Sequence, residues 1–538
     1  MAVPEPKAPF PSLLPEPAHW DEAADLLVVG FGAAGACAAL EAARAGAAVR
    51  ILERFNGGGA TAISGGVVYA GGGTHIQRQA GVEDSPEAMF RYLRQEVQGV
   101  VSDETLRRFC RESAANLQWL AEQGVPFRAD LCPWKTSYPT DDYFLYYSGS
   151  EFAHPFCEEA RPAPRGHRTV GRGNSGGPLF AALRSAVEQA GIPVHTQCKV
   201  QHLISDASGR IAGVQVLEQP EAVRERLAQL ARRIKKLQYY HPPYGLRVHR
   251  QMEQLEQNQP QVRAIKARRG VILAAGGFVF NRKWVEHVNP LASKASPLGT
   301  TADDGWGIRL GQSAGGATAH MDRISVWRFY NPPEAFVRGI LVGEAGHRLC
   351  NEEYYGARIG DHIQAAGGTA WLLMDRAMVR EAWRQLLPQT VFFQRLTALY
   401  LLLAGHRKAR SWEALARKTG LPAQTLAQTL TQYNRGAEAG RDALGKRREV
   451  LHPLTRPPFY AFDLTIGRSP FFPSPSITLG GLVVDEASGQ VLRKDGSPIP
   501  GLYAAGRNAV GICSASYVSG LSLADCVFSG RRAGRAAS

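Results

Sequence analysis

The stretch DLLVVGFGAAG, residues 25–35, is a short apolar run that ends in the glycine pattern Gly30-x-Gly32-x-x-Gly35. Such a run is typical of a buried strand, and a helical stretch and a second strand, which Glu53 ends, follow it. Glycines at this turn let the backbone approach a pyrophosphate, and the helix N-terminus adds N–H groups and partial positive charge. A carboxylate at the end of the second strand can accept a hydrogen bond from a ribose hydroxyl. The whole unit therefore predicts a dinucleotide site, which a lone glycine turn would not.

Three further segments indicate that the dinucleotide is FAD rather than NAD. Residues 57–73, GGGATAISGGVVYAGGG, offer backbone and hydroxyl donors, including Thr61 and Ser64, to a bulky planar group. RRGVILAAGGF (268–278) and GLYAAGR (501–507) each read as a buried strand that ends in small residues. Either one alone could be an ordinary strand and turn. Together with the N-terminal unit they fit the remaining walls of one nucleotide fold whose sequence is interrupted.

The composition is that of a large globular protein. The chain has 538 residues, of which 44% are apolar, enough for two connected domains. Its eight cysteines lack close pairing, which favours a reducing compartment over a disulfide scaffold. The net charge of +14 is spread along the chain, so an anionic cofactor or membrane surface explains it better than nucleic acid does. No apolar run approaches the roughly 20 residues that span a bilayer. We expect a cytoplasmic protein without a metal site, and a peripheral place at the inner membrane surface is the alternative.

These segments, in this order, resemble the FAD-binding family of fumarate reductase and succinate dehydrogenase flavoproteins over nearly the whole chain from about Asp25. The resemblance implies an α/β fold: a Rossmann-like FAD-binding domain, interrupted in sequence, with an inserted α+β capping domain that carries catalytic groups. Residues 299–316 would be the exit to the cap, and residues 452–464 the return. The family's covalent flavin histidine is not evident, because small residues and Thr61 occupy the matching stretch. We therefore expect FAD to be bound non-covalently.

The domain boundaries combine this resemblance with the composition of the N-terminus. The first twenty residues are rich in proline and lack a charged start before an apolar core, so they predict a loose arm and not a signal peptide. The expected units are a flexible arm (1–22), the first part of the FAD-binding domain (23–303) with a helical hairpin insertion (about 219–262), the capping domain (304–455) and the second part of the FAD-binding domain (456–538).

The resemblance also implies a set of residues that line the cofactor. They are glycines, small residues and a few charged groups from each part of the interrupted fold. The expected FAD-binding residues are Gly30, Gly32, Ala33, Ala34, Gly35, Glu53, Arg54, Gly59, Ala60, Thr61, Ser64, Gly65, Gly66, Val200, Ala274, Ala275, Gly276, Asp304, Gly506, Arg507, Gly520, Ser522 and Leu523.

The C-terminal stretch SASYVSGLSLADCVFSGRRAG, residues 514–534, stands where the dicarboxylate-binding members carry histidine and arginine. It is similar to the same stretch in 3-ketosteroid Δ4-(5α)-dehydrogenases. This resemblance implies FAD-dependent desaturation of 3-keto-5α-steroids between C4 and C5 in steroid degradation. It also implies an external electron acceptor. The sequence identifies neither that acceptor nor the oligomeric state. The alternatives are a 3-ketosteroid Δ1-dehydrogenase and a fumarate-reductase-like flavoprotein that acts on another unsaturated carbonyl compound.

Within that stretch Tyr517 and Ser519 are two residues apart, so in extended chain their side chains face the same way. Desaturation beside a ketone removes a proton from the α carbon and a hydride from the β carbon. We expect Tyr517 to donate to the carbonyl and Ser519 to take the proton. The family resemblance adds a relay tyrosine from the cap, Tyr355, with its neighbour Tyr354 in reserve. The alternative is that the pair merely completes a loop.

Four other segments have patterns that predict local structure or a contact. Ser522-x-x-Asp525 resembles a capping box at the start of a helix aimed at the flavin. The aromatic segment 134–151 predicts either a flat wall for a steroid or ordinary core. Residues 221–237 predict an amphipathic helix that packs on the FAD-binding domain or, alternatively, binds a membrane surface or a partner. Residues 392–405 predict core or a lipophilic entrance.

Overall fold

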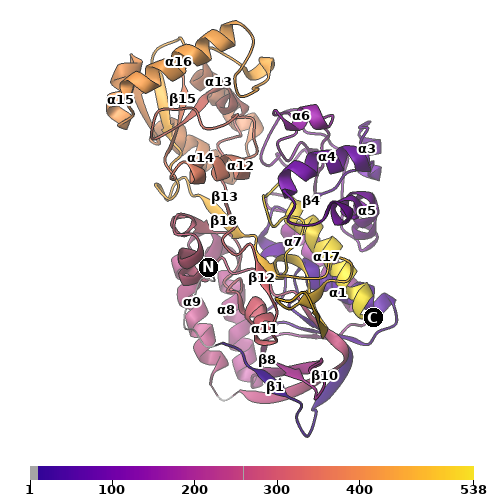
Figure 1. Ribbon diagram of the computed structural model, residues 1–538. Coiled ribbons are helices and arrows are strands. Elements are labelled where there is room, and N and C mark those ends of the chain that lie inside the picture. The colour runs from indigo at the N-terminus through magenta and orange to yellow at the C-terminus, as the bar shows by residue number, and fades with distance from the viewer. Residues whose placement is uncertain (1–9, 259) are drawn as a thin grey trace.

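A nine-stranded sheet forms one end of the molecule in the computed structural model, which describes residues 10–258 and 260–538 (Figure 1). Its main path runs β1-β8-β9-β10-β2-β3-β7, while β21 pairs with β10 and β20 pairs with β21. The strands are β1 (Leu13–Pro15), β2 (Glu22–Val29), β3 (Val49–Leu52), β7 (Val194–His195), β8 (Cys198–Ser205), β9 (Ile211–Glu218), β10 (Gln261–Leu273), β20 (Gln490–Leu492) and β21 (Pro498–Ala504). β2 is parallel to both β3 and β10, as in a Rossmann-like fold.

Strand β2 is buried on both faces, as expected for a parallel strand between layers. Leu26 and Val28 pack in the cluster that includes helices α1 (Ala33–Arg44) and α17 (Leu521–Ala537). Leu27 and Val29 point the other way, into the cluster that continues toward the cap. This explains why the stretch reads as an unbroken apolar run rather than as an alternating one.

Helices α1 and α17 come from opposite ends of the chain and lie side by side (Figure 1). Two glycines of α17 make this possible. A Cβ atom at Gly530 would lie 2.5 Å from the carbonyl oxygen of Ala34, and one at Gly534 would lie 2.4 Å from that of Ala38. The C-terminal helix therefore packs directly over the helix that begins at the glycine turn.

The described part of the N-terminal segment is not a loose arm, so the prediction for residues 1–22 is wrong there. Leu13–Pro15 form β1, which pairs in parallel with β8 at the edge of the sheet. The backbone N–H of Ser12 donates to Nδ1 of His202 over 2.8 Å. The unpaired edge of β8 explains the difference, because it offers backbone partners that composition alone does not reveal. Residues 1–9 lie outside the described residues.

Residues 59–189 add a helical layer and a small sheet to the FAD-binding domain. The helices are α2 (Gly59–Ile63), α3 (His75–Gln79), α4 (Pro86–Val97), α5 (Asp103–Glu122), α6 (Phe156–Glu159) and α7 (Gly176–Gln189). The sheet has the order β4-β6-β5 and consists of β4 (Val67–Tyr69), β5 (Leu145–Tyr146) and β6 (Gly166–Arg168). This small sheet matters for the site, because β5 carries an aromatic residue that reaches the C-terminal loop.

A helical hairpin, α8 (Glu221–Tyr240) and α9 (Pro242–Glu256), is inserted between the antiparallel strands β9 and β10. Leu227, Leu230 and Ile234 of α8 pack against Val248 and Met252 of α9. In Figure 1 the two helices run side by side along one flank of the lower lobe. The hairpin predicted from amphipathic spacing is thus present and packs on the FAD-binding domain.

The cap is a four-stranded antiparallel sheet with helices around it, at the opposite end of the molecule from β1, β8 and β10 (Figure 1). The sheet order is β14-β15-β17-β16. Its strands are β14 (Ile340–Gly343), β15 (Ala370–Met374), β16 (His406–Ala409) and β17 (Phe459–Asp463). Its helices are α12 (Gly356–Ala365), α13 (Arg376–Gln389), α14 (Phe392–Leu403), α15 (Trp412–Thr419) and α16 (Ala423–Glu438).

The chain crosses between the two lobes on strands that pair with each other. β13 (Ile324–Val326) leads to the cap, and β18 (Pro475–Thr478) returns from it. β18 pairs with β13 and also with β11 (Ser296–Pro297), so both crossings belong to one small sheet. A second pair, β12 (Thr318–Ala319) with β19 (Gly481–Leu482), lies beside them in sequence. The crossings are therefore tied together rather than free.

This pairing moves the cap boundaries away from those expected at 304–455. Helix α11 (Trp306–Ser313) belongs to the FAD-binding side, since Trp306 Nε1 donates to the carbonyl oxygen of Val200 over 2.8 Å. β17 belongs to the cap sheet, because it pairs with β15 and β16. These contacts join segments far apart in the chain, and local sequence patterns do not reveal them. We propose residues 327–474 as the cap.

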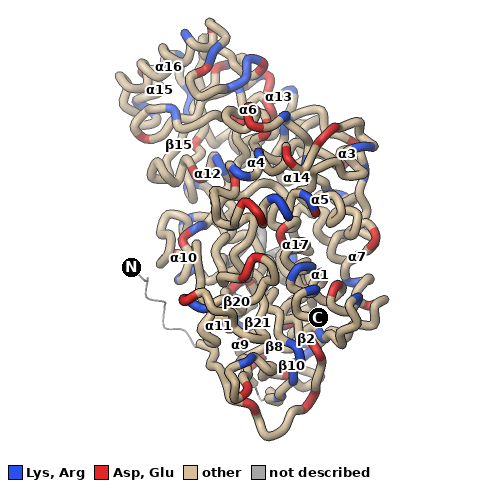
Figure 2. The backbone as a smooth tube through the Cα atoms, turned by 45° about the vertical axis from the view of Figure 1, so that its right-hand side comes forward, with Lys and Arg blue, Asp and Glu red and all other residues tan. Residues whose placement is uncertain are grey.

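Charge is distributed over the whole molecule, with Lys and Arg interspersed with Asp and Glu in Figure 2. The remaining helix, α10 (Arg282–Val288), follows β10. Among residues 10–258 and 260–538, no helix combines the length and apolar character needed to cross a bilayer. The same described residues contain no grouping of three or more His, Cys, Asp or Glu side chains suited to a metal ion.

Candidate active site

Two cavities adjoin each other at the centre of the molecule. The first, of about 640 Å³, runs along the carboxyl ends of β2, β3 and β10 and under the α8–α9 hairpin. The second, of about 260 Å³, lies between the FAD-binding domain and the cap. Both are lined by Ala60, Thr61, Arg507 and Cys526, so they share a wall. A ligand in the first cavity would therefore reach the second.

The glycine turn forms a cradle at one side of the first cavity. Gly30 has a φ of +104°, and a Cβ atom at Gly35 would lie 2.0 Å from the carbonyl oxygen of Gly30. Gly32 differs, because its Cβ would meet nothing nearer than Thr61 Oγ1 at 3.5 Å and would instead occupy the cavity. Helix α1 begins immediately after Gly32, which is its N-cap. The cradle thus has the shape and the helix N-terminus that a pyrophosphate requires.

Glu53 stands at the end of β3 on the rim of the same cavity. Its Oε2 accepts the backbone N–H of Phe31 over 2.8 Å, and its Oε1 accepts that of Phe55 over 2.8 Å. These bonds fix the carboxylate in place and leave further lone pairs for a ligand hydroxyl. The position fits the ribose contact expected from the sequence.

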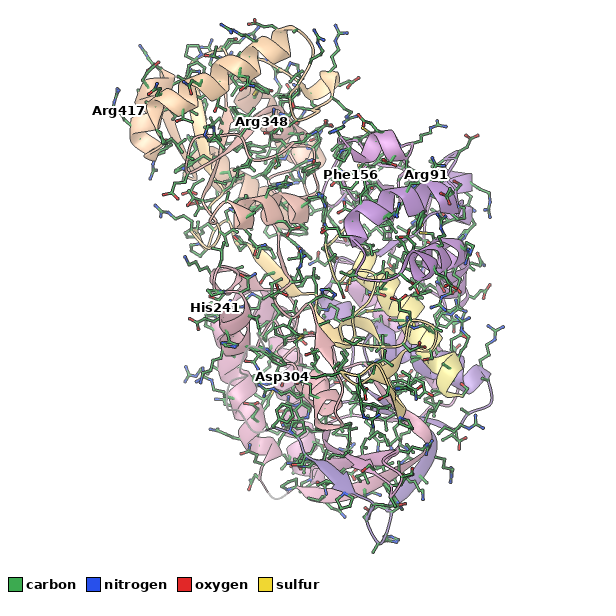
Figure 3. The ribbon with its side chains drawn as sticks, in the orientation of Figure 1. Arg91, Phe156, His241, Asp304, Arg348 and Arg417 are labelled. Atoms are coloured by element: carbon green, nitrogen blue, oxygen red, sulfur yellow. The ribbon has the colours of Figure 1, made fainter. Side chains whose placement is uncertain are left out.

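Arg54 and Asp304 also line the first cavity, but they bind each other and the hairpin. Arg54 donates to both carboxylate oxygens of Glu256 in α9, each over 2.8 Å, and to Asp304 over 2.9 Å. Burial raises the pKa of Glu256, but Arg54 outweighs burial and holds that pKa below its usual value. Figure 3 labels Asp304 in the lower lobe, beside the hairpin. These groups therefore hold the hairpin over the cavity as well as forming its wall.

The expected cofactor residues divide between the two cavities. Lining the first are Gly30, Gly32, Ala33, Ala34, Glu53, Arg54, Gly59, Ala60, Thr61, Val200, Ala274, Ala275, Gly276, Asp304 and Arg507. Lining the second are Ser64, Gly65, Gly66, Gly520, Ser522 and Leu523, together with the shared Ala60, Thr61 and Arg507. Gly35 and Gly506 line neither cavity and act through close packing, as a Cβ at Gly506 would lie 2.8 Å from that of Ala34. The sequence missed the hairpin residues of the first cavity, among them Ala228, Arg232 and Met252.

Tyr517, Ser519 and Tyr355 meet in the second cavity. Val518, between the first two, is fully buried in the apolar cluster that includes helices α1 and α17. The ring of Tyr517 stacks on Trp327 of the cap with centroids 4.6 Å apart. The Tyr355 and Tyr517 ring centroids are 6.3 Å apart. The cap and the C-terminal segment thus bring three hydroxyl groups to one cavity.

Ser519 has a further partner that the sequence did not single out. Tyr146, in β5, places its Oη 2.8 Å from Ser519 Oγ. Tyr146 belongs to the aromatic segment 134–151, which was ambiguous between substrate wall and core. In the structure Tyr138 lines the second cavity, and Tyr146 is completely buried. The only sequence signal was the density of aromatic residues.

The three tyrosines around Ser519 are neutral at ordinary pH. Burial raises the pKa of Tyr517, Tyr355 and Tyr146 above the usual value for a phenol. Nearby phenols add to the shift for Tyr355, and the Ser519 hydroxyl partly offsets it. A neutral phenol donates a hydrogen bond, so Tyr517 is suited to a substrate carbonyl.

Tyr354 lies outside the second cavity. Its Oη donates to the carbonyl oxygen of His154 over 3.0 Å, and its ring stacks on His362 with centroids 5.6 Å apart. Tyr355, by contrast, is the N-cap of α12 and lines the cavity. The geometry therefore places Tyr355, and not its neighbour, beside Ser519.

The start of α17 differs from the expected capping box. Gly520 is the N-cap, with a φ of +86°, and no side chain caps the helix. The helix therefore begins two residues earlier than a cap at Ser522 predicts. A Cβ atom at Gly520 would lie 2.7 Å from the backbone nitrogen of Tyr69, so this turn requires glycine. Ser522 and Leu523, in the first turn, line the second cavity. The N-terminal N–H groups of α17 are thus still presented at the site.

A cradle at a helix N-terminus on a Rossmann-like sheet, joined to a second cavity beneath an inserted cap, defines a flavoprotein oxidoreductase. The chain belongs to the FAD binding domain family, whose model matches residues 25–523. The predicted cofactor, FAD, and the predicted fold class are confirmed by this match.

Steroid dehydrogenases are among the most similar proteins. The 3-oxo-5-alpha-steroid 4-dehydrogenase of Comamonas testosteroni is 38% identical over 500 residues, 91% of this chain and 93% of that protein. The crystal structure of 3-ketosteroid-delta4-(5alpha)-dehydrogenase from Rhodococcus jostii RHA1, in complex with 4-androstene-3,17-dione, matches with a TM-score of 0.82 and 34% identity over 98% of this chain and 99% of that one. The 3-oxosteroid 1-dehydrogenase of Mycobacterium tuberculosis is 27% identical over 92% of this chain and 94% of that protein. The resemblance to Δ4-(5α)-dehydrogenases is confirmed.

Proposed function

We propose that the chain catalyses the FAD-dependent desaturation of 3-keto-5α-steroids between C4 and C5. The observation that carries this proposal is the meeting of Tyr517, Ser519 and Tyr355 in a cavity that shares a wall with the cofactor cavity. The 38% identity to a 3-oxo-5-alpha-steroid 4-dehydrogenase supports the substrate and the position of the new double bond. The remaining site residues keep the cofactor roles expected for them.

Tyr517 donates a hydrogen bond to the C3 carbonyl oxygen. As the α proton leaves, that oxygen takes on enolate charge, and a fixed donor stabilises it more than it stabilises the ketone. Stacking on Trp327 fixes the phenol ring, so the donor needs no reorganisation during the reaction. Bound FAD supplies the acceptor for the hydride that leaves C5.

Ser519 takes the proton from C4 and passes it on. A serine hydroxyl is a weak base by itself and needs a partner that accepts its own proton as it acts. Tyr355 supplies this relay: it accepts the serine proton while its own hydroxyl proton is released. The hydrogen bond to Tyr146 Oη holds the serine hydroxyl in position. Because burial raises the pKa of both phenols, the relay operates between neutral hydroxyl groups rather than through a resident tyrosinate.

The proposal includes FAD that is bound without a covalent bond. Among the described residues that line the two cavities there is no histidine. Cys526 lies on their shared wall, but burial raises its pKa to about 12, so it is protonated and a poor nucleophile. Acid precipitation should release the flavin into the supernatant. Yellow colour that stays with the precipitated chain would contradict this part of the proposal.

The reduced flavin passes its electrons to an external acceptor. The direct test of the proposal is anaerobic mixing of the holoenzyme with substrate candidates while the flavin absorbance is followed. A 3-keto-5α-steroid should bleach the flavin, and succinate should not. Bleaching by succinate alone would favour the fumarate-reductase-like alternative, and lack of bleaching by any ketosteroid would overturn the proposal.

A further inference from the structure

The cap exposes an apolar surface on helix α14. Phe392 is 72% exposed, Leu396 53% and Leu403 68%, and their spacing places them along one side of the helix. Phe471, from the segment that returns to the FAD-binding domain, is 69% exposed, and its ring lies 5.6 Å from that of Tyr400 on α14. We call Phe392, Leu396, Leu403 and Phe471 the apolar cap face.

This exposure is not explained by packing within the chain. The buried side of α14 is already filled by Ala398, Leu401 and Leu402, which belong to the cap core. A helix that is apolar both toward the core and toward solvent lacks the polar face of an ordinary surface helix. Contiguous exposed apolar surface of this kind marks a site of contact with another molecule or with lipid.

The same segments also border the second cavity. Phe393 and Thr397 of α14 line it, and so do Phe472 and Pro473, which directly follow Phe471. Figure 1 shows α12 and α14 nearer to the FAD-binding domain than α15 and α16 are. One set of side chains therefore faces the substrate cavity while its immediate neighbours in sequence face outward.

Charge around the apolar cap face favours an anionic partner. Residues 376–410 contain seven Lys or Arg and one acidic residue, Glu381. Arg380, Arg384, Arg407 and Lys408 are among the exposed cations of this segment. Apolar side chains bordered by cations are the combination that binds the surface of an anionic bilayer, with the apolar groups among the acyl chains and the cations at the headgroups.

We propose that the apolar cap face docks the enzyme on an anionic lipid surface, with the substrate cavity next to the bilayer. The delivery of a membrane-dissolved ketosteroid to that cavity rests on the proposed function, whereas the docking itself does not. Helix α14, within the segment 392–405, would then serve as core on one side and as a lipophilic entrance on another.

The test is co-sedimentation of the FAD-loaded protein with vesicles of phosphatidylcholine, with and without phosphatidylglycerol. The parent should bind the anionic vesicles. The double substitution Phe392→Ser and Leu396→Ser should weaken binding at least roughly tenfold, because two large apolar side chains no longer enter the lipid. The matched control is Val262→Ser, since Val262 is 54% exposed on β10 in the other lobe, and this variant should bind as the parent does.

Two outcomes would overturn the proposal. One is equal vesicle binding by the parent and the double variant, and the other is a parent that dimerises and does not bind vesicles, while the double variant sediments as a monomer. Flavin content and far-UV circular dichroism must match the parent for the comparison to count. Turnover of a dissolved steroid should be unchanged in the double variant, so loss of docking and failure of the proposed chemistry are measured separately.

Discussion

Ser519 lies among hydroxyl groups that arrive from three parts of the chain: Tyr146 from the small sheet, Tyr355 from the cap and Tyr517 from its own segment. Burial raises the pKa of all three phenols and keeps them protonated, so their charge does not distinguish the proposed donor from the proposed relay. The Tyr517 ring stacks on Trp327 and lies near the Tyr355 ring, and part of its surface is open to the cavity. In the proposed mechanism, position rather than an unusual charge state distinguishes the hydroxyl of Tyr517 from those of Tyr355 and Tyr146.

The roles of Tyr517 and Ser519 can be separated by rapid mixing with a 3-keto-5α-steroid. Tyr517→Phe should slow flavin reduction roughly 100- to 1000-fold while substrate affinity changes little, because the donor acts mainly on the enolate. Ser519→Ala should also slow reduction, yet it should still bind the unsaturated product and perturb the flavin spectrum as the parent does. Near-parental reduction in either variant would remove the role assigned to that residue.

The relay is tested by a pair of adjacent tyrosines that act as each other's control. Tyr355→Phe should bind FAD and steroid but lose most turnover, because it removes a hydroxyl beside Ser519 without changing the ring. Tyr354→Phe removes a hydroxyl that binds the carbonyl oxygen of His154 outside the cavity, and should stay active. Steady-state turnover with an artificial dye acceptor measures both. An inactive Tyr354→Phe beside an active Tyr355→Phe would contradict the assignment.

Alanine substitutions at two glycines of the same turn should have different effects, one on FAD binding and the other on folding stability. Gly32→Ala leaves the chain unstrained, since the nearest atom to its Cβ is 3.5 Å away, but the methyl group enters the cradle and should reduce FAD retention. Gly35→Ala forces a contact of 2.0 Å with the carbonyl oxygen of Gly30 and should lower the thermal stability of the apoprotein itself. Flavin absorbance and melting temperature, with and without added FAD, distinguish the two. A Gly32→Ala protein with full flavin content would contradict the placement of the pyrophosphate.

At the scale of elements, the α8–α9 hairpin is joined to the nucleotide fold through Arg54, which binds Glu256 of α9 and Asp304. Asn56 adds a second tie, as its side chain donates to the carbonyl oxygen of Ala228 in α8 over 2.9 Å. An insertion between two antiparallel strands thus becomes one wall of the cofactor cavity. Its amphipathic pattern predicted the helices, but nothing in that pattern indicated what they cover.

Glu256→Gln should therefore loosen the hairpin and weaken FAD binding. Breaking a buried pair by removing one charge typically costs ~3–5 kcal/mol, part of which should appear as faster FAD loss. Glu253→Gln is the control, because Glu253 is 42% exposed and 3.8 Å from Arg54, and exposed pairs contribute about 0–1 kcal/mol. Reconstitution of the apoprotein with FAD, followed by fluorescence, gives both affinities. Equal FAD affinity in the two variants would show that the hairpin does not retain the cofactor.

The sequence predicted the elements better than their boundaries. The glycine turn and the hairpin depend on local spacing, and the structure has a helix start and two helices at those positions. Tyr517 and Ser519, which the spacing grouped, both line the second cavity. The cap boundaries and the strand at Leu13–Pro15 depend on pairing between distant segments, which local patterns do not encode. Tyr146 was missed for the same reason, since it lies 373 residues before Ser519.

The second cavity exists only where the cap meets the FAD-binding domain. Tyr355 and Trp327 come from the cap, whereas Ser519 and Gly65 come from the other lobe. Both crossings between the lobes lie in one small sheet, because β13 and β18 pair directly. The two lobes are therefore held in a fixed relative position. The site requires this, because its three hydroxyl groups come from both lobes.

The position of the new double bond in the product distinguishes desaturation at C4–C5 from desaturation at C1–C2. The holoenzyme is incubated with a saturated 3-keto-5α-steroid and a dye acceptor, and the product is identified by mass spectrometry and proton NMR. Abstraction at C4 by Ser519, with hydride loss from C5, predicts a single product that is two mass units lighter and has its double bond between C4 and C5. A double bond between C1 and C2 in place of that product would contradict the account.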